Sequence, residues 1–189
     1  MSLREQILAY QPYNEQEEHD RLLILDFLEA NDDAFLRSNR IAHMTASAWV
    51  TNPQRTKVLM VYHNLYDSWS WCGGHADGQT DLLQVALKEC REETGLERVR
   101  PVSEEIFSLE CLTVDGHEKR GEYVSSHLHL NVTYLLEAED TQTLTACEGE
   151  NSGVCWFAPE DALKASTEPW FVQRIYRKLN QRMSDFPKK

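Results

Sequence analysis

The sequence lacks an excess of basic residues, and this limits the partners that the chain can bind. Its 189 residues contain 19 Lys and Arg against 31 Asp and Glu, which gives a formal net charge of −12 at pH 7. A nucleic-acid polymer or an anionic membrane requires a basic surface that neutralises phosphate. The composition therefore argues against both partners, whereas a small anionic ligand held through metal ions remains compatible with it.

Long apolar runs and paired cysteines are also missing. The longest apolar stretch, Leu22 to Leu28, is interrupted by Asp26 and is far shorter than the roughly 20 residues of a membrane span. The N-terminal segment MSLREQILAY has no signal-peptide pattern. The five cysteines include no CxxC pair, which is typical of reduced thiols. We therefore expect a cytoplasmic protein without a disulfide framework.

The chain does contain the material for one substantial hydrophobic core. It is 41% hydrophobic and 26% charged, and its length is typical of one domain. Internal repeats, low-complexity tracts and a clear linker are absent. We therefore expect a single domain over residues 1–189, in which an N-terminal helical extension (1–40) precedes a core (41–189) that ends in a helix.

Local patterns predict strands and helices in alternating groups. Asn14, with Glu17 three residues later, predicts a helix start, and Asn31 predicts a second short helix through Leu36. Strand patterns occur at 43–51, 57–63, 106–114, 127–137 and 154–157, and a polar turn at 115–118 separates two of them. Further helices are expected at 80–94, from Pro159 to Leu163 and at 170–183, and a glycine turn at 73–74. This order fits an α+β or three-layer α/β domain with a mixed β-sheet.

One predicted helix carries three carboxylates on the same stripe. Glu89, Glu92 and Glu93 stand at positions i, i+3 and i+4, where like charges repel by a few tenths of a kcal/mol per pair. The helix macrodipole also disfavours anions near its C-terminus. A hard divalent cation such as Mg²⁺ would compensate, because it prefers carboxylate and water oxygens. The alternative is a solvated helix face neutralised by Lys88 and Arg91.

The segment from 74 to 96 resembles the Nudix box. That pattern is Gly, five residues, Glu, seven residues, Arg-Glu-apolar, any residue, Glu-Glu, any residue, Gly-apolar. Seven of its nine fixed positions match, and they are Gly74, Glu89, Cys90, Glu92, Glu93, Gly95 and Leu96. The resemblance implies a three-layer α/β/α sandwich in which a loop-helix-loop holds cations.

The same resemblance implies a chemistry and the residues that perform it. Mg²⁺ or Mn²⁺ would be bound by Glu89, Glu92, Glu93 and the Gly74 carbonyl. The reaction would be metal-dependent hydrolysis of a diphosphate linkage in a nucleoside diphosphate joined to another group, or in a similar small phosphorylated metabolite. Beyond the ligands, we expect catalytic roles for Glu92, Glu93 and Lys88. We nominate Glu150 as general base, with Glu148 second.

Two positions depart from the Nudix pattern. Thr80 stands in place of the first glutamate, where we expect it to cap the helix, and Lys88 replaces the arginine. Lysine keeps the charge but lacks the planar two-pronged donor of arginine. These departures leave open a different function, a Nudix-fold metabolite sensor that binds without turnover.

Four of the seven histidines suggest a second metal site. His127 and His129 alternate along a predicted strand, so both rings point to one face. Together with His43 and His75 they are similar to the metal arrangement of type 1 isopentenyl diphosphate isomerase, a Nudix-fold relative. Imidazole suits Zn, Mn, Fe or Ni better than Mg. The alternative is that these are surface histidines or hydrogen-bonded core histidines.

Isomerase activity is the third function that the sequence leaves open. The isomerase's catalytic cysteine would fall at Gly73, and Cys72 is one residue out of register, which in a strand turns the side chain to the other face. Trp71, next to the box, is the tryptophan we expect to stack on a substrate, unless it packs in the core. A homodimer is compatible with the sequence.

Overall fold

The computed structural model describes residues 1–119 and 121–187, and the chain divides into two compact units. Unit 1 comprises Met1–Ser47, Gly73–Ala86 and Glu104–Tyr134, and unit 2 comprises Ala48–Cys72, Leu87–Ser103 and Leu135–Lys189. Four elements contribute residues to both units: β1 (Ala42–Thr51), β4 (Cys72–His75), α3 (Leu82–Thr94) and β9 (His127–Glu137). The expectation of one domain over residues 1–189 stays a prediction.

Unit 1 begins with two helices, α1 (Leu3–Ala9) and α2 (Glu15–Ala30). The Asn14 side chain accepts a hydrogen bond from the Glu17 backbone N–H, so the predicted helix start is confirmed. The sequence patterns did not reveal α1, whose seven residues are too few for a clear period. The short helix expected from Asn31 to Leu36 is wrong, because that segment forms turns closed by bonds between residues three apart.

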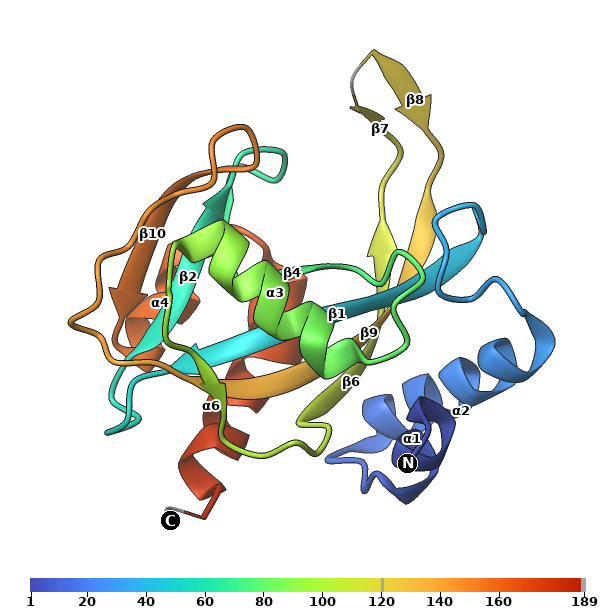
Figure 1. Cartoon of the computed structure of the whole chain (residues 1–189), viewed down its shortest axis with the longest axis horizontal. Coiled ribbons are helices and arrows are strands. Elements are labelled where there is room, and N and C mark those ends of the chain that lie inside the picture. The colour runs from blue at the N-terminus through green and yellow to red at the C-terminus, as the bar shows by residue number, and fades with distance from the viewer. Residues whose placement is uncertain (120, 188–189) are drawn as a thin grey trace. The chain divides into compact units, whose positions relative to one another are not determined.

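The long strands of unit 1 form an antiparallel pair with a hairpin beyond it. β6 (Ser108–Val114) pairs with β9, so that Leu112 faces His129. The segment between them holds β7 (His117–Lys119) and β8 (Glu122–Val124), a two-stranded ribbon that projects past the ends of β6 and β9 (Figure 1). The simple polar turn expected at 115–118 is therefore wrong.

A buried carboxylate joins the N-terminal helices to the strands of unit 1. Glu17 is fully buried, and its Oε2 accepts hydrogen bonds from the Tyr10 hydroxyl (2.6 Å) and the Tyr13 backbone N–H (2.7 Å). Its Oε1 accepts one from the Ser108 hydroxyl at 2.7 Å. Since a buried charge is tolerated only when it is paired or hydrogen-bonded, these donors fix α2 against β6.

Glycine at position 73 permits a close approach of two backbones in unit 1. Gly73 lies within strand β4, so the expected glycine turn is wrong. A Cβ atom at Gly73 would lie 2.5 Å from the Ser47 Oγ and 2.7 Å from the Ala46 carbonyl oxygen. Contacts this short are not tolerated, and only glycine lets the box segment lie so near β1.

Unit 2 contains the other strands and the C-terminal helices. Its strands are β2 (Val58–His63), β3 (Ser68–Ser70), β5 (Arg100–Pro101) and β10 (Asn151–Phe157). The strands expected at 43–51 and 57–63 are confirmed and form a hairpin, since β2 pairs antiparallel with the end of β1. β2 also pairs with β3 and β10. β5 pairs with the end of β9.

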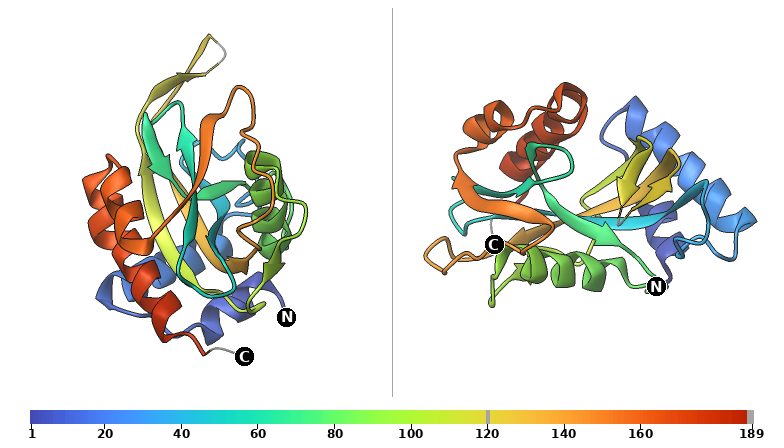
Figure 2. Two further views of the ribbon diagram at one scale, coloured as in Figure 1. Left: turned by 90° about the vertical axis from the view of Figure 1, so that its left-hand side faces the viewer. Right: turned by 90° about the horizontal axis from the view of Figure 1, so that it is seen from above.

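The C-terminal helices of unit 2 lie side by side (Figure 2). Pro159 occupies the first turn of α4 (Pro159–Ala165), as expected. The single helix expected at 170–183 is instead α5 (Pro169–Phe171), a π-helical turn η1 (Val172–Tyr176) and α6 (Arg177–Asp185). The Asn180 side chain donates a hydrogen bond to the Pro159 carbonyl at 2.9 Å, which holds α6 to α4.

The hydrogen-bonded strand order of the larger sheet is β10-β2-β1-β9-β5. In addition, β3 pairs with β2, β4 pairs with β1, and β6 pairs with β9. This mixed sheet with its helices confirms the expected α+β class. Over the described residues, no helix combines the length and the apolar character that crossing a membrane requires.

Candidate functional site

The end of α3, in unit 2, brings together a lysine and two glutamates. The Lys88 Nζ donates hydrogen bonds to Glu92 Oε2 at 2.9 Å and to Glu89 Oε1 at 3.2 Å. This contact with Glu92 raises the pKa of Lys88, so the side chain stays protonated. Lys88 thereby holds the two carboxylates one helical turn apart on one face, which reduces their mutual repulsion.

Glu89 is the more buried member of this group. Its side chain is 16% exposed, and burial raises its pKa, although Lys88 opposes the shift. The charges of Glu92 and Glu150 raise the pKa of Glu89 further. A carboxylate that is partly desolvated and surrounded by like charge is a favourable ligand for a cation, because the cation removes both penalties.

Glu93 lies on the buried side of the helix end. It is 5% exposed, and its backbone carbonyl accepts a hydrogen bond from the Asn151 side chain at 2.9 Å. Its carboxylate acts on Cys72, whose pKa is raised well above the usual value by a hydrogen bond with Cys90, by burial and by the charge of Glu93. Cys72 is therefore a protonated, buried thiol at neutral pH and not an activated nucleophile.

Glu150, our nominated base, is exposed on the loop before β10 in the same unit. Its backbone is held at both ends, because its N–H donates to the Cys147 carbonyl at 3.1 Å and its carbonyl accepts from the Asn64 N–H at 3.2 Å. Its effect on the pKa of Glu89 places it within electrostatic reach of the helix carboxylates. Glu148 is exposed on the same loop.

The carboxylates suit a hard divalent cation by their donor chemistry. Glu89, Glu92 and Glu93 offer only oxygen ligands, and Glu89 carries an unfavourable burial that a cation would relieve. Their oxygens do not form a tight preassembled cluster, because Lys88 holds two of them and Glu93 faces the interior. Metal binding at these residues stays a prediction.

Three other predicted residues take defined positions. Gly74 lies in β4 within unit 1. Thr80 is exposed ahead of α3. The expectation that Thr80 caps this helix is wrong, because Asp81 is the cap: its Oδ1 accepts a hydrogen bond from the Gln84 N–H at 3.3 Å. Trp71 is 8% exposed and packs edge-on against Phe171 and Tyr176, at centroid distances of 6.2 and 5.7 Å. This favours core packing, and its stacking on a substrate stays a prediction.

Unit 1 gathers four imidazole rings at one place. The centroid of the His43 ring lies 5.1 Å from that of His75 and 5.0 Å from those of His127 and His129. Within residues 1–119 and 121–187, one group of three or more His, Cys, Asp or Glu residues has its ligand atoms within 4.8 Å of one another, and that group is His43, His75 and His129. His127 Nε2 lies 3.2 Å from His129 Nε2. The four histidines therefore form one cluster, to which β1, β4 and β9 contribute.

Backbone carbonyls orient two of these rings. His43 Nδ1 lies 3.0 Å from the Asn39 carbonyl oxygen, and His127 Nδ1 lies 2.9 Å from the Ser125 carbonyl oxygen. Each contact requires Nδ1 to carry the proton, which leaves Nε2 with its lone pair. Sequence reasoning did not identify Asn39 and Ser125, because a backbone carbonyl leaves no signal in the residue type.

Two rings of the cluster, His43 and His129, have lowered pKa values. Burial lowers the pKa of His129 to about 2, and the neighbouring His75, His43 and His127 contribute to the same shift. Burial also lowers the pKa of His43. Both rings are therefore neutral at pH 7, the form in which imidazole binds metal.

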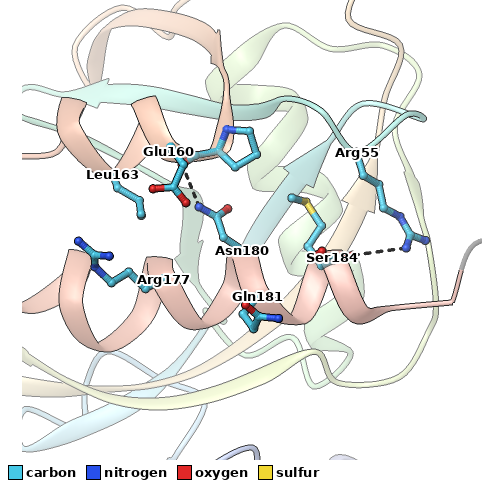
Figure 3. Close-up of a pocket in the computed structure, with 9 residues that line it drawn as sticks. Arg55, Glu160, Leu163, Arg177, Asn180, Gln181 and Ser184 are labelled. Carbon is cyan, nitrogen blue, oxygen red and sulfur yellow. Dashed lines mark hydrogen bonds between the residues drawn. The ribbon is translucent and has the colours of Figure 1, made fainter.

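A separate hollow lies between α4 and α6 of unit 2 (Figure 3). Its volume is about 470 Å³, and none of the predicted site residues lines it. Arg55, at its edge, donates to the carbonyls of Met183 and Pro187 at 3.4 and 3.0 Å. This arginine caps the C-terminal end of α6 and is accounted for by that structural role.

The comparison with protein families gives the class of the protein. Residues 42–179 match the model of the NUDIX domain, which is most of the chain. The chain belongs to the NUDIX domain family, whose members are generally hydrolases that act on acid anhydrides and use divalent metal ions. The resemblance noted at residues 74–96 is confirmed. None of the curated protein sequences matches this chain significantly.

Several solved structures have the same fold, and three of them differ in the activity or ligand that is described for them. A Caenorhabditis elegans Ap4A hydrolase in a binary complex is 17% identical, with a TM-score of 0.51 over 76% of this chain and 96% of its own. The NUDIX domain of Shewanella oneidensis NrtR, complexed with ADP ribose, is 17% identical, with a TM-score of 0.53 over 84% and 97%. The Escherichia coli dihydroneopterin triphosphate pyrophosphohydrolase is 13% identical, with a TM-score of 0.52 over 76% and 93%. At these identities the likeness concerns the fold alone.

Proposed function

We propose that this protein is a Mg²⁺- or Mn²⁺-dependent hydrolase that cleaves the diphosphate linkage of a small phosphorylated metabolite, such as a nucleoside diphosphate joined to another group. The observation that carries the proposal is the group on α3. There Glu89 is half-buried with a raised pKa, Lys88 bridges it to Glu92, and Glu93 stands at the next position of the family's box.

The structural neighbours support the substrate class. The proteins of the same fold are described as acting on Ap4A or dihydroneopterin triphosphate, or as complexed with ADP ribose. All three compounds contain phosphates joined in an anhydride. The net charge of −12 fits a small phosphorylated substrate better than a polymer, because an acidic surface repels a long phosphate chain.

The residues have separate roles in this proposal. Glu89, Glu92 and Glu93 would hold the cation, which would supply neutralisation of phosphate charge and a lower pKa of the attacking water. Lys88 positions Glu89 and Glu92 through its two hydrogen bonds. Glu150 accepts the proton of the attacking water as it bonds to phosphorus, while the anhydride oxygen leaves with the other phosphate.

A diphosphate panel tests this function. The purified protein is incubated with nucleoside diphosphate sugars, dinucleoside polyphosphates and prenyl diphosphates, with Mg²⁺ or Mn²⁺, and monophosphate release is measured. We expect turnover by the wild type and a loss of about 100-fold or more in kcat for Glu93→Gln, which removes a charged ligand but keeps the shape. Glu97→Gln is the matched control, because Glu97 is exposed just beyond the box.

The same panel separates the other functions. Saturable binding without turnover in the wild type would replace the hydrolase by a metabolite sensor, a function suggested by Thr80 in place of the box's first glutamate. A rearranged prenyl product would indicate an isomerase, although the buried, protonated Cys72 offers it no activated thiol. Equal turnover by Glu93→Gln and Glu97→Gln would overturn the assignment of the site to α3.

A further inference from the structure

The histidine cluster (His43, His75, His127 and His129) belongs to unit 1, whereas the carboxylates of the proposed diphosphate chemistry belong to unit 2. His43 lies on β1, His75 ends β4, and His127 and His129 lie on β9. Because side chains alternate along a strand, His127 and His129 share one face of β9. The periodicity within one strand cannot bring together imidazole rings from three different strands. Their convergence is a property of the folded unit.

The spacing of the ring nitrogens is close to the reach of a single ion. With metal–nitrogen bonds of about 2.0–2.1 Å, two ligands of a tetrahedral ion lie about 3.3 Å apart, and ligands on opposite sides of an ion lie about 4.2 Å apart. His127 Nε2 and His129 Nε2 are separated by 3.2 Å. The ligand atoms of His43, His75 and His129 lie within 4.8 Å of one another. Since this limit is wider than about 4.2 Å, a single ion would draw these three rings closer together.

One atom in the cluster lacks the partner that its burial demands. His43 is 4% exposed, and its Nε2 is a buried acceptor with no hydrogen-bond partner. A buried polar atom left unpaired costs about 1–3 kcal/mol. The other nitrogen of the same ring donates to the Asn39 carbonyl, so the ring cannot turn to satisfy Nε2 without losing that bond. A cation among the four rings would supply the missing partner.

The arrangement around the rings is the one that metal-ligating histidines adopt. A ligating imidazole normally donates its second N–H to a carbonyl or carboxylate, which fixes its tautomer and orientation. His43 does so to Asn39, and His127 does so to Ser125. Both rings are thereby oriented before any ion arrives.

We propose that His43, His75, His127 and His129 form a binding site for one divalent first-row transition-metal ion, distinct from the Mg²⁺ or Mn²⁺ ligands on α3. Four nitrogen donors without a carboxylate select borderline ions such as Zn²⁺, Co²⁺ or Ni²⁺ and reject Mg²⁺, which takes oxygen ligands. Together with the carboxylates of the proposed function, this site would give the protein two metal sites of opposite ligand preference.

Titration of the chelator-treated, full-length protein with Co²⁺ tests the site. Co²⁺ bound by several imidazoles gives visible ligand-field absorption, and Zn²⁺ abolishes that absorption by displacement. We expect one Co²⁺ per chain, displaced by Zn²⁺ and unaffected by a large excess of Mg²⁺. His129→Ala and His75→Ala should each weaken Co²⁺ binding by about 100-fold or more, because each removes a direct ligand.

Controls separate this site from the carboxylates and from misfolding. His19→Ala removes an exposed histidine of the same unit and should bind Co²⁺ as the wild type does. Glu93→Gln should also retain Co²⁺ binding, even where it abolishes hydrolysis, so failure of one site is distinguishable from failure of the other. Circular dichroism and thermal unfolding establish that each variant is folded. Because His75 is half-buried and His43 is buried, replacing His75 should disturb the packing of the protein less than replacing His43.

A second measurement locates the ligands directly. Nitrogen-15 NMR of the histidine rings, recorded with and without Zn²⁺, should show the Nε2 signals of His43 and His127 shifting while His19 stays unchanged. The proposal is overturned if Zn²⁺ leaves the cluster's signals unaltered, or if folded His129→Ala and His75→Ala bind Co²⁺ like the wild type. It is also overturned if the Co²⁺ absorption disappears in Glu93→Gln and persists in the histidine variants.

Discussion

Glu168 shows how burial of a single carboxylate controls stability. It lies at the start of the short helix α5, and burial raises its pKa while a hydrogen bond from Ser68 opposes the shift. The raised pKa means that at pH 7 a charged Glu168 costs more free energy in the folded chain than in the unfolded chain. A neutral side chain of the same shape removes that penalty.

We predict that Glu168→Gln raises the free energy of unfolding at pH 7, and that this gain disappears towards pH 4. The folded pKa is raised, so as pH falls the folded state takes up the proton first and the wild type recovers stability relative to the variant. The gain shrinks as pH falls through the raised pKa of the folded chain and is lost once both states are protonated. Urea unfolding at several pH values measures it.

Glu160→Gln is the matched control for this substitution. Glu160 is exposed at the start of α4 and carries the same charge, so its replacement changes the net charge equally without relieving a buried group. A stability difference between Glu168→Gln and the wild type that stays constant from pH 7 to pH 4 would show that burial of the charge is not its cause.

At the scale of elements, the attachment of the N-terminal helices depends on Glu17. We predict that Glu17→Ala lowers the free energy of unfolding by about 3 kcal/mol, because it removes the acceptor of the buried Tyr10 hydroxyl and of the Tyr13 backbone N–H and leaves Ser108 only its bond to Glu110. Chemical denaturation measures the loss. Proteolysis should also cut the N-terminal helices of the variant faster than those of the wild type.

Glu15→Ala is the control for that prediction, because Glu15 lies in the first turn of the same helix with a side chain 92% exposed. It removes the same charge from the same helix end and should cost only a few tenths of a kcal/mol. Equal losses for the two variants would mean that the helix dipole, and not the buried network, accounts for the effect.

Elements with complete local signals could be predicted from the sequence. β9 has the expected bounds, 127–137, because its alternating apolar and polar residues define a strand without tertiary help. Gly95 follows α3 with φ of +72°, the left-handed conformation that a helix-ending glycine adopts. These features depend on residue type and spacing alone.

Elements fixed by distant contacts were missed. β4 is extended at Gly73 because the segment approaches Ser47, which is 26 positions earlier and invisible to a local pattern. The turns at 31–36 replace a helix although Asn31 resembles a cap. The expected pairing of His127 and His129 followed from strand alternation, whereas the proximity of His43 and His75 to them, and the carbonyls that orient the rings, depend on the tertiary structure.

At the scale of the whole molecule, the net charge of −12 sets the response to salt. Like charges repel over a Debye length, which is about 30 Å at 0.01 M salt and about 8 Å at 0.15 M. Self-repulsion destabilises a folded state of high charge, so screening by monovalent salt stabilises it. This general effect has to be separated from the specific binding of cations at the carboxylates of α3.

We predict that Mg²⁺ raises the unfolding temperature beyond the effect of NaCl at matched ionic strength. Ligand binding to the folded state adds RT ln(1 + [L]/Kd), about 1.4 kcal/mol at ten times the Kd. Thermal unfolding of the wild type in the two salts measures this increment. Glu89→Gln and Glu93→Gln should lose it, whereas Glu97→Gln, with the same net charge as those variants, should keep it. If all three retained the increment, Mg²⁺ would be acting on the overall charge, and the carboxylates of α3 would not be its site.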